Sequence, residues 1–182
     1  KLVEVVNRSG LPLVAGSEDY GYVAFRALFI HDGSSIIEEQ GDFVFCSDDG
    51  VNYLVGYTGS DVNVVLPSSY NGEPYGIAGF AFLQSNIESV VIPSGVTSIG
   101  ESAFEACEHL TTVSIGSSVT DIGDNAFAYC TALTAVNIPG SVRRIGGGAF
   151  WGCENMTSIT LNEGTEEIGE YAFYGCTGLT SV

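Results

Sequence analysis

A 23-residue repeat is the feature of this sequence that most constrains its fold. Each repeat carries an alanine-phenylalanine pair, and a cysteine follows three residues after each phenylalanine. The phenylalanines are Phe104, Phe127, Phe150 and Phe173, and the cysteines are Cys107, Cys130, Cys153 and Cys176. Self-similarity at a fixed period of this length is typical of solenoids, in which each repeat stacks on its neighbours. A solenoid has a long surface and no interior cleft, which favours binding or structural roles over catalysis.

The apolar residues of one repeat predict a short strand followed by turns. Val113 and Ile115 alternate with polar residues, as in a strand with one buried face. Strands of successive repeats would stack as a parallel sheet with a spacing of about 4.8 Å. Gly123 and its equivalents precede each Ala-Phe pair, where we expect tight backbone geometry. The Ala-Phe pair itself is expected to form a short helical or 3₁₀ turn. We expect almost complete burial of the stacked rings of Phe82, Phe104, Phe127, Phe150 and Phe173.

The repeat pattern Leu-x-x-Val-x-Ile-Pro-x-x-Val-x-x-Ile-Gly-x-x-Ala-Phe-x-x-Cys resembles the BspA-like, or Treponema-type, leucine-rich repeat. It covers residues 87–182 cleanly, and residues 62–86 with one insertion and one deletion. The resemblance implies a right-handed leucine-rich-repeat solenoid of the α/β class, dominated by β structure. Short parallel strands would form one face, and short helical or 3₁₀ turns at Ala-Phe the other. It also implies a bacterial cell-surface or secreted protein with an adhesive or recognition role.

The rest of the chain is expected to interrupt the repeat array. Residues 1–7 resemble a strand of a preceding repeat, and residues 8–61 lose the 23-residue rhythm. Within that segment, residues 43–45 and 53–57 predict the two strands of a hairpin. We interpret residues 8–61 as an irregular insertion docked on the solenoid, and residues 62–182 as repeats truncated at the C-terminus. Because no capping repeat follows, we expect the chain to be an internal fragment of a longer protein.

The charge of the chain limits its partners. The sequence has 22 acidic residues and 5 lysines or arginines, which gives a net charge of −17. Such a surface repels phosphate backbones and anionic membranes, so we expect no nucleic-acid partner. No stretch approaches the roughly 18 apolar residues of a membrane span, and we expect no membrane insertion by this fragment. A signal peptide or an anchor would lie outside it.

Four cysteines at one repeat position leave a metal site, disulfides or core packing as interpretations. Stacked positions about 5 Å apart lie within the Cα range of disulfides. A ladder of parallel thiols, however, lacks the converging ligands of a zinc site. The odd count of five, with Cys46 outside the ladder, argues against a complete disulfide framework. We favour reduced cysteines that pack as small hydrophobes, and we expect no metal and no cofactor.

The sequence contains little that could support catalysis. His31 precedes an aspartate, but no nucleophile motif accompanies the pair. His109 occupies a variable repeat position, where we expect an exposed loop. The glycine-rich run at residues 146–152 follows from the repeat register and lacks a P-loop lysine. We therefore expect no catalytic residues. An enzyme with its site in residues 8–61 is the least favoured alternative.

Two surfaces of the predicted solenoid are candidates for ligand binding. One is a column of mostly small polar residues at the outward strand positions. These positions are Ser89, Val91, Thr112, Ser114, Ala135, Asn137, Ser158 and Thr160. The other is the Ala-Phe side, which carries Tyr129, Trp151, Tyr171 and Tyr174. Exposed aromatic residues are enriched in recognition sites, so we predict contacts on this side. The alternative is that these rings only cover the turn of the next repeat.

We also expect two arginines to pair with acids on neighbouring repeats. Arg144 would lie between Asp121 and Glu167, and Arg143 would lie one repeat from Glu166. Such exposed pairs contribute only about 0.2–1 kcal/mol each. Their expected role is to offset repulsion between acidic turns.

The leading functional hypothesis is a non-catalytic recognition or adhesion module, secreted or on the cell surface. It would bind a protein or a glycan, on a host or a neighbouring cell, through the solenoid surface. A structural spacer that projects another domain is the alternative, since polar, uncharged strand faces suit that role equally well.

Overall fold

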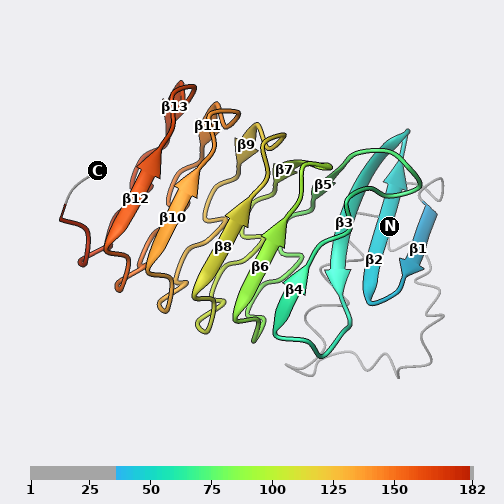
Figure 1. Ribbon diagram of the computed structural model, residues 1–182, viewed down its shortest axis with the longest axis horizontal. Helices are drawn as coiled ribbons and strands as arrows, with labels where there is room; N and C mark the ends of the chain where they lie inside the picture. The colour runs from blue at the N-terminus through green and yellow to red at the C-terminus, as the bar shows by residue number, and fades with distance from the viewer. Residues whose placement is uncertain (1–35, 181–182) are drawn as a thin grey trace, which may run out of the picture.

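The computed structural model describes residues 36–180 and shows a β-solenoid whose turns stack along one axis (Figure 1). The described residues form thirteen strands. They are β1 (Ile36–Gln40), β2 (Phe43–Asp48), β3 (Val51–Tyr57), β4 (Asn63–Val65), β5 (Tyr75–Ile77), β6 (Ser89–Ile92), β7 (Val96–Ile99), β8 (Thr112–Ile115), β9 (Asp121–Ile122), β10 (Ala135–Ile138), β11 (Arg144–Ile145), β12 (Ser158–Leu161) and β13 (Glu167–Ile168). The predicted repeat strand at residues 1–7 lies outside the described residues.

Two sheets line the solenoid. The five-stranded sheet has the order β12-β10-β8-β6-β4, and the eight-stranded sheet has the order β1-β2-β3-β5-β7-β9-β11-β13. Strands of successive turns pair in parallel, so that Val90 stands beside Val113 and Ile99 beside Ile122. The predicted fold class, a leucine-rich-repeat solenoid with short parallel strands, is confirmed. The second sheet was missed, because β9, β11 and β13 are two residues long and show no alternation.

We call each turn of the solenoid, which corresponds to one 23-residue repeat, a rung. Reverse turns, rather than a helix, form the Ala-Phe side of each rung. Around Phe104, the Ala103 amide donates to the Gly100 carbonyl (3.3 Å) and the Cys107 amide to the Phe104 carbonyl (3.2 Å). The Phe104 amide donates to the Ala126 carbonyl of the next rung (2.8 Å) and is therefore not available for a helical bond. No helix occurs among residues 36–180, so the expected helical or 3₁₀ turn is not confirmed. Nor does this part of the chain contain a helix that could cross a membrane.

A continuous stack of phenylalanine rings fills the core. Its ring centroids are 4.9 Å apart for Phe82–Phe104, 5.1 Å for Phe104–Phe127, 5.3 Å for Phe127–Phe150 and 5.6 Å for Phe150–Phe173, with ring planes within 11° of parallel. The first four rings are buried. Phe173 is only half-buried, which corrects the expectation of near-complete burial. It lies in the last described rung, where no further turn covers its second face.

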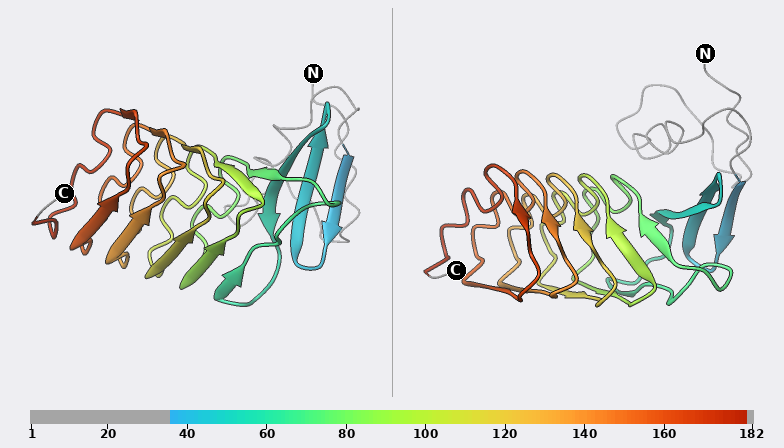
Figure 2. Two further views of the ribbon diagram at one scale, coloured as in Figure 1. Left: turned by 45° about the horizontal axis from the view of Figure 1, so that its top comes forward. Right: turned by 90° about the horizontal axis from the view of Figure 1, so that it is seen from above.

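The β2–β3 hairpin lies at one end of the solenoid (Figure 2). Strand β3 pairs in parallel with β5, and so the hairpin continues the eight-stranded sheet. The Tyr57 ring lies 6.0 Å from the Phe82 ring, and Phe43 packs 5.3 Å from Tyr57. The insertion after Leu66 forms a turn in which Tyr70 and Glu73 exchange two backbone hydrogen bonds of 2.9 Å. The predicted domain boundaries at residues 7 and 61 stay predictions.

Candidate functional site

The four aromatic residues predicted as a binding site lie on the Ala-Phe side of three consecutive rungs; we call them the aromatic surface. Tyr129, Tyr171 and Tyr174 are 47%, 61% and 59% exposed, and Trp151 is half-buried. The ring centroids of Trp151 are 5.0 Å from Tyr174 and 5.7 Å from Tyr171. Tyr171 and Tyr174 meet edge to face at 5.8 Å. The fold thus brings three of the four predicted residues into mutual contact.

The backbone of the turns positions these residues. Tyr129 and Tyr171 have φ angles of 58° and 59°, in the left-handed region, at the two points of each rung where the chain reverses. The Tyr129 amide donates to the Trp151 carbonyl (2.6 Å), and the Gly152 amide donates to the Tyr174 carbonyl (2.8 Å). Three rungs therefore hold the aromatic surface through their main chains. This arrangement fixes its position without using the side chains.

Tyr129 also covers part of the next rung. A Cβ atom added at Gly152 would lie 2.9 Å from the Tyr129 ring, so this ring rests on the glycine backbone. The alternative that the rings only cover neighbouring turns therefore describes one face of Tyr129. Nearly half of that side chain still meets solvent, as do more than half of Tyr171 and Tyr174. Most of the aromatic surface is available to a partner.

Acidic residues stand in the same rungs as the aromatic surface. Glu170 precedes Tyr171, and its carbonyl accepts a hydrogen bond from Gly148 in the rung of Trp151 (2.9 Å). Glu154 follows Trp151 by three residues. Both side chains are exposed, and within residues 36–180 neither carboxylate has an ion pair or a hydrogen bond. Their negative charges are not neutralised by this part of the chain.

The second candidate surface is the outer face of the five-stranded sheet, which we call the strand face. It carries mostly small polar side chains. Its outward positions carry Ser, Thr, Asn and Ala, apart from Val65 and Val91. These two valines are register partners on β4 and β6, and they are 65% and 41% exposed. The face therefore has one small apolar spot near the hairpin and no aromatic ring. It offers fewer groups of the kind that anchor partners.

The cysteine column is part of the core. Cys107, Cys130, Cys153 and Cys176 are buried, and all four are free thiols, as is Cys46. Each column thiol donates to the carbonyl of a phenylalanine in the preceding rung. These bonds are Cys107 to Phe82 (3.0 Å), Cys130 to Phe104 (3.2 Å), Cys153 to Phe127 (3.1 Å) and Cys176 to Phe150 (3.1 Å). Burial raises the pKa of Cys107 to about 12 and raises that of Cys130 as well. The sequence indicated burial of these thiols but not their hydrogen bonds.

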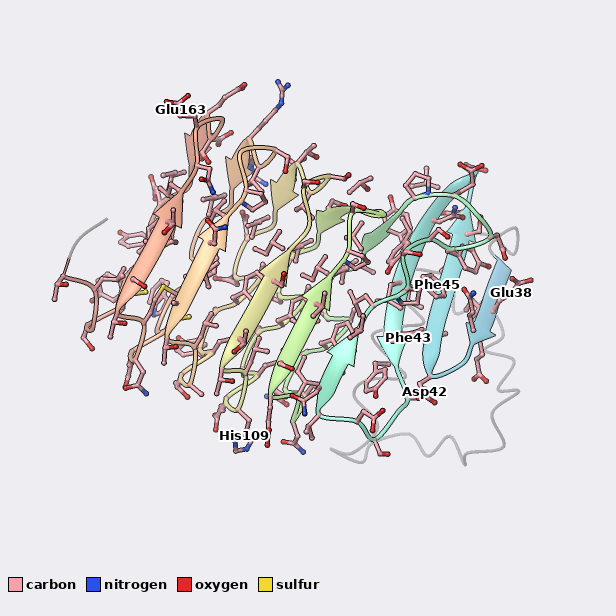
Figure 3. The ribbon with its side chains drawn as sticks, viewed as in Figure 1. Glu38, Asp42, Phe43, Phe45, His109 and Glu163 are labelled. Atoms are coloured by element: carbon pink, nitrogen blue, oxygen red, sulfur yellow. The ribbon has the colours of Figure 1, made fainter. Side chains whose placement is uncertain are left out.

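No metal centre is found in the described part of the chain, where no group of three or more His, Cys, Asp or Glu side chains could hold an ion. His109 lies exposed in the loop before β8 (Figure 3). His31 falls outside the described residues. Among residues 36–180, His109 forms no ion pair.

The two arginines pair with acids between rungs, with one change of partner. Arg143 lies 3.3 Å from Glu166, and Arg144 lies 3.9 Å from Glu167. The second partner of Arg144 is Asp124 at 3.0 Å, rather than the predicted Asp121. The Asp121 carboxylate instead accepts a hydrogen bond from Thr120 Oγ1 (2.7 Å). This local bond explains why the prediction of Asp121 was wrong.

Solved structures of bacterial proteins share this architecture. The leucine-rich repeat protein of T. pallidum is 29% identical, with a TM-score of 0.73 over 78% of this chain and 69% of that chain. A leucine-rich repeat protein from Bacteroides capillosus is 28% identical, with a TM-score of 0.62 over 69% of this chain and 98% of that one.

A third structure, from Faecalibacterium prausnitzii, is described as a leucine rich cell surface protein. It is 24% identical, with a TM-score of 0.55 over 83% of this chain and 55% of that chain, and this likeness shows the fold alone. Comparison with curated proteins gives no match. A family model described as the BspA type leucine rich repeat region matches residues 76–182 in six copies. The chain therefore belongs to the BspA-type leucine-rich repeat family.

Proposed function

We propose that this chain is a non-catalytic recognition module of a secreted or cell-surface bacterial protein, and that its aromatic surface contacts the partner. Bacterial leucine-rich repeat proteins are generally protein-interaction modules, and solenoids bind through faces built from several repeats. The observation that carries the proposal is the cluster of Trp151, Tyr171 and Tyr174. Its tyrosines are more than half exposed although the repeat offers buried positions for aromatic rings.

The aromatic surface suits recognition better than the strand face does. Tyrosine and tryptophan bring large contact area with few rotatable bonds, and they dominate binding energy at interfaces. The strand face has small polar side chains and two neighbouring valines, Val65 and Val91. A partner on the strand face would find fewer anchors. We therefore place the adhesive contact, to a protein or a glycan of a host or neighbouring cell, on the aromatic surface.

A binding panel tests the proposal directly. The immobilised chain is incubated with purified extracellular-matrix proteins and with glycans, and binding is compared between wild type and a Tyr171→Ala/Tyr174→Ala variant. The double variant is expected to lose binding while its unfolding midpoint changes little, because both side chains are largely exposed.

A matched control uses the other surface. Thr112→Ala/Ser158→Ala removes two exposed hydroxyl groups of the strand face and should leave binding unchanged. Binding that is lost only in this control variant would move the contact to the strand face. Absence of binding to every member of the panel would instead favour the spacer role.

A further inference from the structure

The aromatic surface differs from the core stack in how its rings meet. The core phenylalanines lie within 11° of parallel and hide their faces from solvent. The planes of Trp151, Tyr171 and Tyr174 are tilted by 46°, 60° and 88° to one another. Both tyrosines are also more than half exposed. The cluster therefore leaves aromatic surface open to a ligand.

Charges in the same rungs as these rings favour one sign of ligand. The carboxylates of Glu154 and Glu170 have no ion pair or hydrogen bond within residues 36–180. In that part of the chain, Arg143 and Arg144 are the only lysines or arginines, and both are engaged with acids along the eight-stranded sheet. No cation of the described residues competes for the aromatic surface. A positively charged ligand would meet attraction there from both the rings and the carboxylates.

We propose that the partner segment on the aromatic surface is an extended, arginine-rich stretch of polypeptide. This inference rests on the proposed function and adds the chemistry of the partner. Arginine fits better than lysine, because its planar guanidinium stacks on aromatic faces and also pairs with carboxylates. An extended chain can reach across all three rungs of the surface, which are spaced about 4.8 Å apart. A neutral glycan would use the rings and leave Glu154 and Glu170 without a role.

The chain provides its own reporter for the test. Trp151 is the only tryptophan in the sequence, and its fluorescence therefore reports on this surface alone. A short peptide of alternating arginine and serine is titrated against the chain, beside a twin peptide with glutamine at each arginine. A neutral β-glucan oligosaccharide serves as the third probe. The arginine peptide is expected to change the Trp151 fluorescence with saturation, and the glutamine peptide and the oligosaccharide are not.

Two double variants separate a defined site from general attraction to an acidic protein. Tyr171→Ala/Tyr174→Ala leaves the net charge unchanged and should weaken the peptide at least about tenfold in Kd. Glu154→Gln/Glu170→Gln should weaken it and reduce its dependence on salt. Equal Kd values for wild type and the tyrosine variant would overturn the inference, as would failure of the arginine peptide to bind. A response to the oligosaccharide alone would overturn it too, while leaving the recognition role of the surface intact.

Discussion

Single residues set the spacing between rungs, and at Gly146 there is no room for a side chain. A Cβ atom added at Gly146 would lie 2.5 Å from the backbone nitrogen of Asp124 and 2.5 Å from the carbonyl carbon of Gly123, both in the preceding rung. At Gly147 the nearest atom would be the Glu170 carbonyl oxygen at 3.4 Å, an ordinary contact. Two adjacent glycines thus differ sharply in their surroundings.

We therefore predict that Gly146→Ala destabilises the chain by at least about 1–3 kcal/mol, the cost of overpacking against groups that cannot move freely. Gly147→Ala, its neighbour and matched control, should change the free energy of unfolding by less than about 0.5 kcal/mol. Urea denaturation followed by circular dichroism measures both. Equal effects of the two substitutions would show that the rungs can separate at Gly146.

The buried thiol of Cys107 makes stability depend on pH. Its folded pKa of about 12 lies above that of a thiol in the unfolded chain, about 8.5. The folded state therefore keeps the proton that the unfolded state loses. The stabilisation is fully present below about pH 8.5 and is lost as the pH rises toward 12.

We predict that between pH 8 and pH 10 the wild type loses about 1–2 kcal/mol more of its unfolding free energy than Cys107→Ala does. The measurement is urea denaturation at both pH values under reducing conditions. Because each protein is compared with itself at the two pH values, the pH-independent loss of stability caused by the substitution cancels. Identical losses in the two proteins would mean that Cys107 ionises normally in the folded state.

At the scale of elements, the β2–β3 hairpin protects the open end of the ring stack. Tyr57 is half-buried between Phe82 and Phe43, and its hydroxyl exchanges hydrogen bonds with the backbone of Asp61 (3.1 and 3.3 Å). Without this ring, one face of Phe82 would meet solvent. The hairpin thus acts as a cap for the repeats.

We predict that Tyr57→Ala lowers the free energy of unfolding by about 1–3 kcal/mol, less than the 3–5 kcal/mol for a fully buried ring. Tyr57→Phe keeps the ring and loses only the hydroxyl bonds, which should cost about 1 kcal/mol or less. Thermal and urea unfolding of both variants provide the comparison. If the alanine variant is no less stable than the phenylalanine variant, the ring does not support the stack.

The elements also show which parts of the fold a sequence can reveal. The strand of Val113 and Ile115 was predictable, because alternation of apolar residues is a direct signature of one buried face. The strand at β9 was not, since two residues carry no period. The expected helical or 3₁₀ turn at Ala-Phe was not confirmed, because amides there bond to the next rung, a partner 22 residues away in the case of Phe104 and Ala126. Local patterns do not report such distant partners.

At the scale of the whole molecule, the sequence placed the candidate site on one side of the solenoid but did not show its contacts. The repeat register alone put Tyr129, Trp151 and Tyr174 on consecutive rungs. The packing of Tyr171 against Trp151 and Tyr174 accompanies a left-handed conformation at Tyr171, which a tyrosine does not predict. The ion pair predicted between Arg144 and Asp121 is absent for a similar local reason. The Asp121 carboxylate accepts a hydrogen bond from Thr120, and Arg144 pairs with Asp124.

The identical hydrogen bonds passed from rung to rung have an evolutionary consequence. Because the Cys130 thiol meets Phe104 as the Cys153 thiol meets Phe127, a duplicated or deleted unit of 23 residues would recreate these core contacts. Unequal recombination between repeats would then lengthen or shorten the array in whole turns at little cost in stability. The four-residue insertion at Tyr70–Glu73 instead lies in the turn between β4 and β5. The number of repeats can therefore change between generations. Selection could adjust how far the solenoid extends toward a partner while the core contacts stay the same.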